Sequence, residues 1–129
     1  MLDTSAYSEF IRGNEDAKKR IQEADGIFLS PVALGELLAG FVSGKNEKAN
    51  RAILEQFLSS PRVRVLNIDG ETSERYANIV RHLRESGTPI PTNDVWIASS
   101  AMQHGLKVLT SDAHFQKVPQ IITLFLSAM

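Results

Sequence analysis

Short apolar runs separated by one or two helical patterns recur along the whole chain, and this alternation constrains the fold more than any other feature. Strands are predicted at five runs: residues 1–3, 26–29, 63–68, 107–110 and 121–126. Strands that alternate with helices form parallel sheets, because each helix returns the chain to the same end of the sheet. We therefore predict an α/β fold, a three-layer α/β/α domain around a central parallel sheet of five strands.

Capping and terminating residues delimit the helices between these runs. Helices are predicted at residues 5–12, 31–42, 46–59, 69–86 and 92–104, with another beginning near residue 14. Ser30 and Pro31 provide an N-cap followed by proline at the first helical position, and Gly87 ends a later helix. In a doubly wound fold, ligand sites lie beyond the carboxyl ends of the strands. Side chains at these ends are therefore the first functional candidates.

Composition limits the classes of protein that the chain can belong to. Its 129 residues allow about two-thirds of the unfolded surface to be buried, enough for one core, so residues 1–129 are taken as a single domain. The absence of cysteine excludes disulfides and thiolate chemistry and favours a reducing compartment. The chain starts with neither a basic nor an apolar leader segment, and no apolar run approaches the roughly 20 residues of a membrane helix. We expect a cytoplasmic protein.

Acidic side chains follow the predicted strands at one edge of the sheet. Asp3 ends the first strand, Asp112 follows the fourth by two residues, and Asp94 lies in the first turn of the helix that leads into the fourth. Glu36 is the only ionisable side chain between residues 32 and 42, and a charge in so apolar a stretch is expected to be paired. Each has a simpler interpretation, the aspartates as helix or turn caps and Glu36 as a side chain that reaches to solvent.

Taken together, these four carboxylates predict a cation. Each like-charged pair at about 5.5 Å costs roughly 3 kcal/mol at an effective dielectric constant near 20, and no Lys or Arg adjoins any of the four in sequence. An all-oxygen site suits Mg²⁺ or Mn²⁺. The absence of cysteine and the scattered histidines argue against structural zinc, and no EF-hand loop is present for calcium.

Four motifs that carry these acids occur in order along nearly the whole chain. They are LDTSA at positions 2–6, SPVALGEL at 30–37 with glycine at 40, TNDVWIA at 92–98 and LTSDAHF at 109–115. With these motifs the chain resembles the VapC-type toxins of the PIN-domain ribonucleases. One departure is that only Met1 and Leu2 precede Asp3, where members of the family usually have several apolar residues. Either the first strand is a stub or the true start lies upstream, and in the first case Asp3 is less firmly held.

The resemblance implies a doubly wound fold, a homodimer, a cognate VapB-like antitoxin, and RNA cleavage at a metal held by Asp3, Glu36, Asp94 and Asp112. A carboxylate-held divalent ion supplies a nucleophilic water and relieves charge on the phosphate. Asp3, Asp94 and Asp112 are the expected direct or water-mediated ligands. Glu36 either completes the shell or orients the attacking water, and the number of ions stays open.

Other side chains near the motifs have weaker functional interpretations. Ser5 and Thr110 are candidates for orienting the carboxylates, although cap and turn roles explain them equally well. His114 lies close to Asp112 in sequence, which leaves contact with substrate open. Trp96 is expected in the core or in a dimer contact rather than as a stacking platform for bases.

RNA and an antitoxin need surfaces beyond the acids. When the four candidate site acids are left out, the 14 Lys and Arg outnumber the remaining 11 Asp and Glu by 3. This excess of positive charge favours binding to a phosphate backbone. The basic residues near the first helices are Arg12, Lys18, Lys19, Arg20, Lys45, Lys48 and Arg51.

An antitoxin segment is expected to cover part of the apolar surface of the helices. The apolar residues in question are expected partly in the core and partly under this segment, and they are Phe10, Ile11, Leu38, Phe41, Val42, Ile53 and Phe57.

Two other functions compete with the ribonuclease hypothesis. A PIN-like fold that has lost activity would serve only as a binding module, but the four acids are all present. A metal-dependent phosphohydrolase acting on small phosphate esters is the other, and the chain lacks the Asp-x-Asp nucleophile motif and the P-loop glycine pattern. The acids do not identify the RNA, because target choice depends on the shape of the groove.

Overall fold

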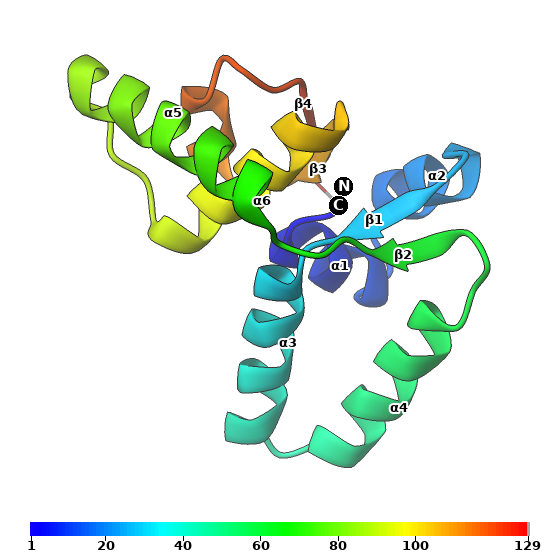
Figure 1. Ribbon diagram of the computed structural model, residues 1–129. Coiled ribbons are helices and arrows are strands. Elements are labelled where there is room, and N and C mark those ends of the chain that lie inside the picture. Colours follow the sequence, from blue (N-terminus) through cyan, green and yellow to red (C-terminus); the bar gives the residue numbers. More distant parts are fainter. Residues whose placement is uncertain (129) are drawn as a thin grey trace.

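Helices surround a few short parallel strands in the computed structural model, which describes residues 1–128 (Figure 1). In chain order the elements are α1 (Thr4–Ile11), α2 (Glu15–Glu23), β1 (Ile27–Leu29), α3 (Pro31–Ser43), α4 (Glu47–Leu58), β2 (Val63–Val65), α5 (Gly70–Ser86), α6 (Thr92–His104), β3 (Val108–Thr110), the 3₁₀ helix η1 (Ala113–Lys117) and β4 (Thr123–Phe125). The α/β class is the one predicted from the alternating pattern. No helix in this part of the chain is long and apolar enough to cross a membrane.

The strands form two parallel pairs, β1 with β2 and β3 with β4. Leu2 joins the pairs by isolated parallel bridges to Leu29 and to Leu109, and its backbone N–H donates to the Phe28 carbonyl at 2.9 Å. A continuous sheet of five strands is therefore not confirmed. The physical reason is that the first strand ends at Asp3, whose side chain already caps α1, so a single residue is left to pair on both sides.

Local signals set the ends of the helices that approach the site. The Asp3 carboxylate accepts from the Ala6 N–H at the start of α1, and the Ser30 hydroxyl accepts from the Val32 N–H at the start of α3. Gly105 ends α6 with φ 64, a left-handed conformation that favours glycine and turns the chain directly toward β3.

The core lies between the strands and the helices, and a smaller cluster lies beside it. Leu29, Ile97 and Phe115 are completely buried in the main core, so β1, α6 and η1 are held by the same packing. Tyr7 and Leu37 belong to the second cluster, which joins α1, α3 and α4. The second cluster supports the helical pair that extends away from the sheet in Figure 1.

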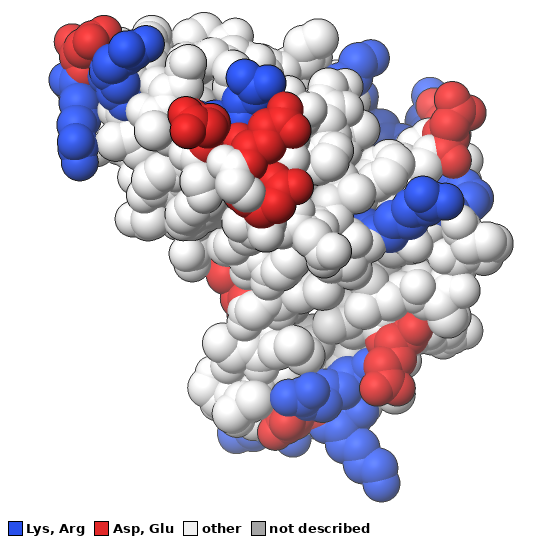
Figure 2. All heavy atoms as spheres, in the orientation of Figure 1, with Lys and Arg blue, Asp and Glu red and all other residues white. Residues whose placement is uncertain are grey.

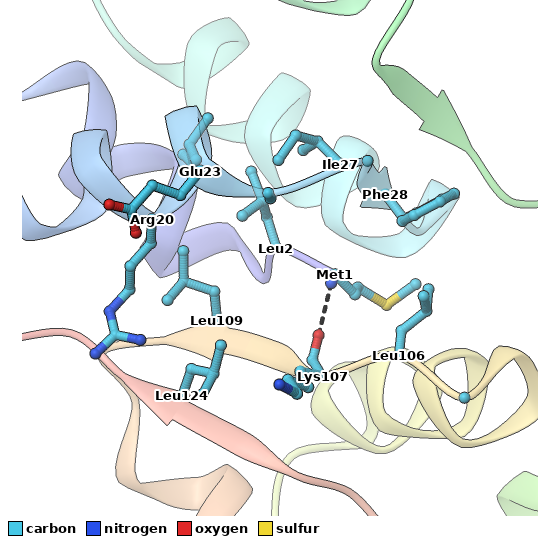
Figure 3. Close-up of a pocket in the computed structure, with 14 residues that line it drawn as sticks. Met1, Leu2, Arg20, Glu23, Ile27, Phe28, Leu106, Lys107, Leu109 and Leu124 are labelled. Carbon is cyan, nitrogen blue, oxygen red and sulfur yellow. Dashed lines mark hydrogen bonds between the residues drawn. The ribbon is translucent and has the colours of Figure 1, made fainter.

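A cavity of about 510 Å³ lies around the first two residues (Figure 3). Apolar side chains that include Leu2, Ile27 and Leu109 line it, and Arg20 and Lys107 contribute charge. None of the four predicted site acids lines this cavity. It opens at the amino ends of the strands, so it is distinct from the candidate site at their carboxyl ends.

Candidate metal centre

Two of the predicted acids meet a histidine beyond the carboxyl end of β3. Asp94, Asp112 and His114 each place one donor atom so that all three atoms lie within 4.8 Å of one another. The Nδ1 atom of His114 is 3.1 Å from Asp94 Oδ2 and 3.1 Å from Asp112 Oδ1. Residues from α6 and from the start of η1 thus form one group that is suited to a cation.

Helix starts and buried packing hold this group in place. Asp94 lies in the first turn of α6, and its side chain is 13% exposed. Asp112 caps η1 by accepting from the His114 N–H at 2.9 Å. Phe115 is completely buried, which anchors η1 and fixes the neighbouring His114 at the surface with a side chain that is 41% exposed.

Asp3 lies buried next to this group, with hydrogen bonds to both of its oxygens. Its Oδ1 accepts from the Ser5 hydroxyl at 2.7 Å and from the Ala6 N–H at 2.8 Å, and its Oδ2 accepts from the Thr110 hydroxyl at 2.6 Å. The same two hydroxyls accept from the loop that follows β3: the Asp112 N–H donates to Thr110 and the Ser111 N–H donates to Ser5. Ser5 and Thr110 therefore link Asp3 to the segment that carries Asp112.

Glu36 of α3 is half-buried and held from two other elements. The Thr4 hydroxyl donates to Glu36 Oε1 at 2.7 Å, and the Asn93 side-chain amide donates to Oε2 at 3.3 Å. Sequence reasoning gave Asn93 no role, because nothing local signals a contact 57 residues away. The one feature of the sequence that could have pointed to Asn93 is its position directly before Asp94 at the start of a helix.

Burial controls the electrostatics of the site. It raises the pKa of Asp94 to about 6; the hydrogen bond with His114 acts in the opposite direction, and Asp112 and Glu36 raise it further. Burial also raises the pKa of Asp3, against the hydrogen bonds from Thr110, Ala6 and Ser5. Within residues 1–128, no Lys or Arg forms an ion pair with any of the four acids. The site is thus short of positive charge, as the sequence predicted.

The donor set fits a hard divalent cation. Carboxylate oxygens are the preferred ligands of Mg²⁺ and Mn²⁺, a neutral imidazole is compatible with Mn²⁺, and no thiolate is present. Glu36 and Asp3 lie outside the three-residue group, so their part in holding an ion stays a prediction.

Three of the seven basic residues proposed to steer RNA form ion pairs within the protein. Arg12, Arg20 and Arg51 each pair with an acid three or four residues earlier in the chain, Arg51 with Glu47 at 2.9 Å. Arg20 also lines the cavity at the far end of the strands. On the face drawn in Figure 2, basic side chains lie in several small groups with acidic side chains beside them, and they do not form one basic surface.

Comparison with known proteins gives consistent relatives. The family model described as "PIN domain" matches residues 1–121. The chain is 34% identical over 93 residues to Ribonuclease VapC4 of Mycobacterium tuberculosis, covering 72% of each, and 32% identical over 120 residues to VapC ribonuclease Y4jK of Sinorhizobium fredii, covering 87% of this chain and 86% of that one.

Solved structures share the whole architecture. A chain in the crystal structure of DNA-bound VapBC from Salmonella typhimurium has a TM-score of 0.87 and 29% identity, with 97% of this chain and 96% of that chain covered. A chain of FitAcB from Neisseria gonorrhoeae has a TM-score of 0.80 and 28% identity over 95% of this chain and 94% of that one.

Proposed function

Because this chain belongs to the PIN domain family, we propose that it is a metal-dependent endoribonuclease, the toxin of a VapBC-type toxin–antitoxin pair. One observation carries the proposal. Asp94 and Asp112, which are 18 positions apart in sequence, meet at the carboxyl edge of the strands without a Lys or Arg partner in the described residues. Relatives named as ribonucleases support RNA as the substrate.

In this proposal Asp94 and Asp112 would hold Mg²⁺ or Mn²⁺, and Asp3 would be a direct or water-mediated third acid. The bound ion would lower the pKa of a water and offset charge on the phosphate. Ser5 and Thr110 keep Asp3 oriented, since their hydroxyls donate to both of its oxygens.

Glu36 is the proposed acceptor for a proton of the attacking water. Thr4 fixes one of its oxygens, and the other has only the longer contact to Asn93, which leaves lone pairs free. The water oxygen forms the new bond to phosphorus and the bond to the leaving sugar oxygen breaks. The leaving oxygen then takes a proton from solvent.

An antitoxin would cover the apolar face formed by α1, α3 and α4. On these helices Ile11, Val42 and Ile53 are 43%, 59% and 42% exposed, while Phe10, Leu38, Phe41 and Phe57 are partly buried against the core clusters. An amphipathic helix is the partner chemistry that suits such a face. The related chain from Salmonella typhimurium is part of a VapBC complex, which supports an antitoxin of the VapB kind and a dimeric toxin.

Cleavage assays separate the proposed function from its alternatives. The purified chain is incubated with single-stranded RNA, or with a small phosphate ester, in Mn²⁺, in Mg²⁺ and in EDTA. We expect cleavage of RNA alone, and only with a divalent ion. Turnover of the ester alone would indicate a phosphohydrolase, and no turnover of either substrate would indicate a binding module.

A further inference from the structure

Of the group formed by Asp94, Asp112 and His114, only His114 is not one of the four acids that the family resemblance implies. Its Nδ1 atom faces Asp94 and Asp112 rather than solvent, although the side chain is 41% exposed overall. An exposed histidine side chain has room to rotate into water. The position of the ring between two carboxylates therefore needs a physical explanation.

The two distances from the His114 ring to the aspartates match those between neighbouring ligands of one metal ion. At bond lengths of about 2.1 Å, neighbouring ligands in an octahedral shell lie about 3.0 Å apart. The Nδ1 atom of His114 is 3.1 Å from an oxygen of each aspartate. The His114 ring is therefore already at ligand spacing from both aspartates, and all three donor atoms lie within 4.8 Å of one another.

The backbone keeps the imidazole beside the two acids. The His114 N–H donates to Asp112 Oδ1 at 2.9 Å, and Phe115 locks the next position in the core. The η1 helix also packs directly against α6, which carries Asp94. The ring is thus presented by a rigid element, as a ligand would be, and not by a free loop.

Resting on the proposed function, we propose that His114 Nδ1 is a direct ligand of the catalytic ion and that it makes the site prefer Mn²⁺ over Mg²⁺. Mg²⁺ binds oxygen in a strict octahedron and keeps several waters, and imidazole nitrogen is a poor substitute. Mn²⁺ accepts a mixed shell of nitrogen and oxygen more readily. A site with one imidazole and two carboxylates therefore discriminates between the ions, which an all-carboxylate site does far less.

The competing explanation is that a protonated His114 hydrogen-bonds to the two aspartates and has to leave when an ion enters. The two explanations predict opposite effects of His114→Ala. Loss of a ligand weakens Mn²⁺ binding, whereas loss of a competing cation strengthens binding of both ions.

The test measures Mn²⁺ coordination and affinity at one neutral pH, apart from activity. Pulsed electron paramagnetic resonance of bound Mn²⁺ detects a directly coordinated nitrogen, and calorimetric titration gives the affinities for Mn²⁺ and Mg²⁺. The variants are His114→Ala and the control His104→Ala, an exposed residue at the opposite end of α6. We expect a nitrogen coupling in wild type and His104→Ala that His114→Ala lacks, and a ratio of Mn²⁺ to Mg²⁺ affinity that falls about tenfold or more in His114→Ala.

Bound Mn²⁺ without nitrogen coupling, or equal changes in both affinities in His114→Ala, would overturn the ligand role while leaving the proposed ribonuclease intact. The variant Asp94→Asn tells the two failures apart. If wild type binds no Mn²⁺, or Asp94→Asn binds it as tightly as wild type, the metal centre itself is wrong and both proposals fail.

Discussion

At the scale of single residues, buried hydroxyls determine how well the acids are held. Thr110 is completely buried, donates to Asp3 at 2.6 Å and accepts from the Asp112 N–H at 2.8 Å. The nearly isosteric change Thr110→Val removes these hydrogen bonds inside the core, together with the 3.2 Å contact to the Ser5 hydroxyl. We expect the free energy of unfolding in EDTA to fall by about 1–3 kcal/mol, because a buried carboxylate loses a donor.

Urea denaturation measures this loss, with Thr123→Val as the matched control. The Thr123 hydroxyl has only a 3.4 Å contact to the Phe115 carbonyl, so the control is expected to change stability by less than about 0.5 kcal/mol. Equal effects of the two substitutions would mean that the link between Asp3 and Asp112 is energetically unimportant.

Asp94 is expected to make the free energy of unfolding of the metal-free protein depend on pH. Its pKa rises from 3.8 to about 6 on folding, so between these values the folded state binds more protons than the unfolded state. The stabilising contribution of this group is complete below about pH 4 and is lost as the pH rises through about 6. In Asp94→Asn this contribution is absent, and above pH 6 the variant should be at least as stable as wild type.

Urea unfolding of both proteins in EDTA, from about pH 4 to about pH 7, tests the sign of this effect. We expect the stability of wild type relative to Asp94→Asn to decrease across this range. A constant difference would show that Asp94 is an ordinary carboxylate in the first turn of a helix.

At the scale of the elements, the apolar face of α1, α3 and α4 is expected to bind the antitoxin. Val42→Asp changes a side chain that is 59% exposed, so it should alter stability by less than about 0.5 kcal/mol while placing a charge in the interface. Calorimetry with its VapB-like antitoxin should show at least a tenfold loss of affinity, or about 1.4 kcal/mol.

Ile122→Asp is the control for this surface. Ile122 is 61% exposed, but it lies before β4 rather than on the apolar face. Antitoxin binding that is lost equally in both variants, or in neither, would place the interface elsewhere.

Helix ends that depend on local interactions could be predicted from the sequence, whereas strand pairing could not. The Ser30 cap, Pro31 and Gly105 act within a few residues, and the helices that they delimit were predicted to within about two residues. Strand pairing is not local. The run at 63–68 pairs only over Val63–Val65, and the first strand is reduced to the bridges at Leu2.

The site likewise combines features that could be predicted from the sequence with features that depend on packing. Asp112 could be placed at the edge where the parallel strands end, and Asp94 beside it because its helix leads back into β3. The sequence could not show that Asn93 reaches Glu36, or that His114 turns toward the acids, because both depend on how separate elements pack.

At the scale of the whole molecule, metal binding should stabilise the fold. An ion that binds only the folded chain raises stability with the logarithm of its free concentration over its dissociation constant. Millimolar Mn²⁺ should therefore raise the Tm of wild type clearly above its value in EDTA, and raise that of Asp94→Asn less. Thermal melting of both proteins measures this, and equal increases in Tm would contradict a metal centre at Asp94.

The most direct measurement of the central claim is metal-dependent RNA cleavage by wild type, Asp94→Asn and Asp25→Asn, prepared identically. Asp25 is exposed in the loop before β1, at the opposite end of the strands, and its substitution removes the same charge. We predict that wild type and Asp25→Asn cleave at equal rates with Mn²⁺ and not in EDTA. Asp94→Asn should be slower by about 10²-fold or more, because an amide is a poor ligand for a hard dication. Cleavage by Asp94→Asn at the rate of wild type, or cleavage that persists in EDTA, would contradict the account.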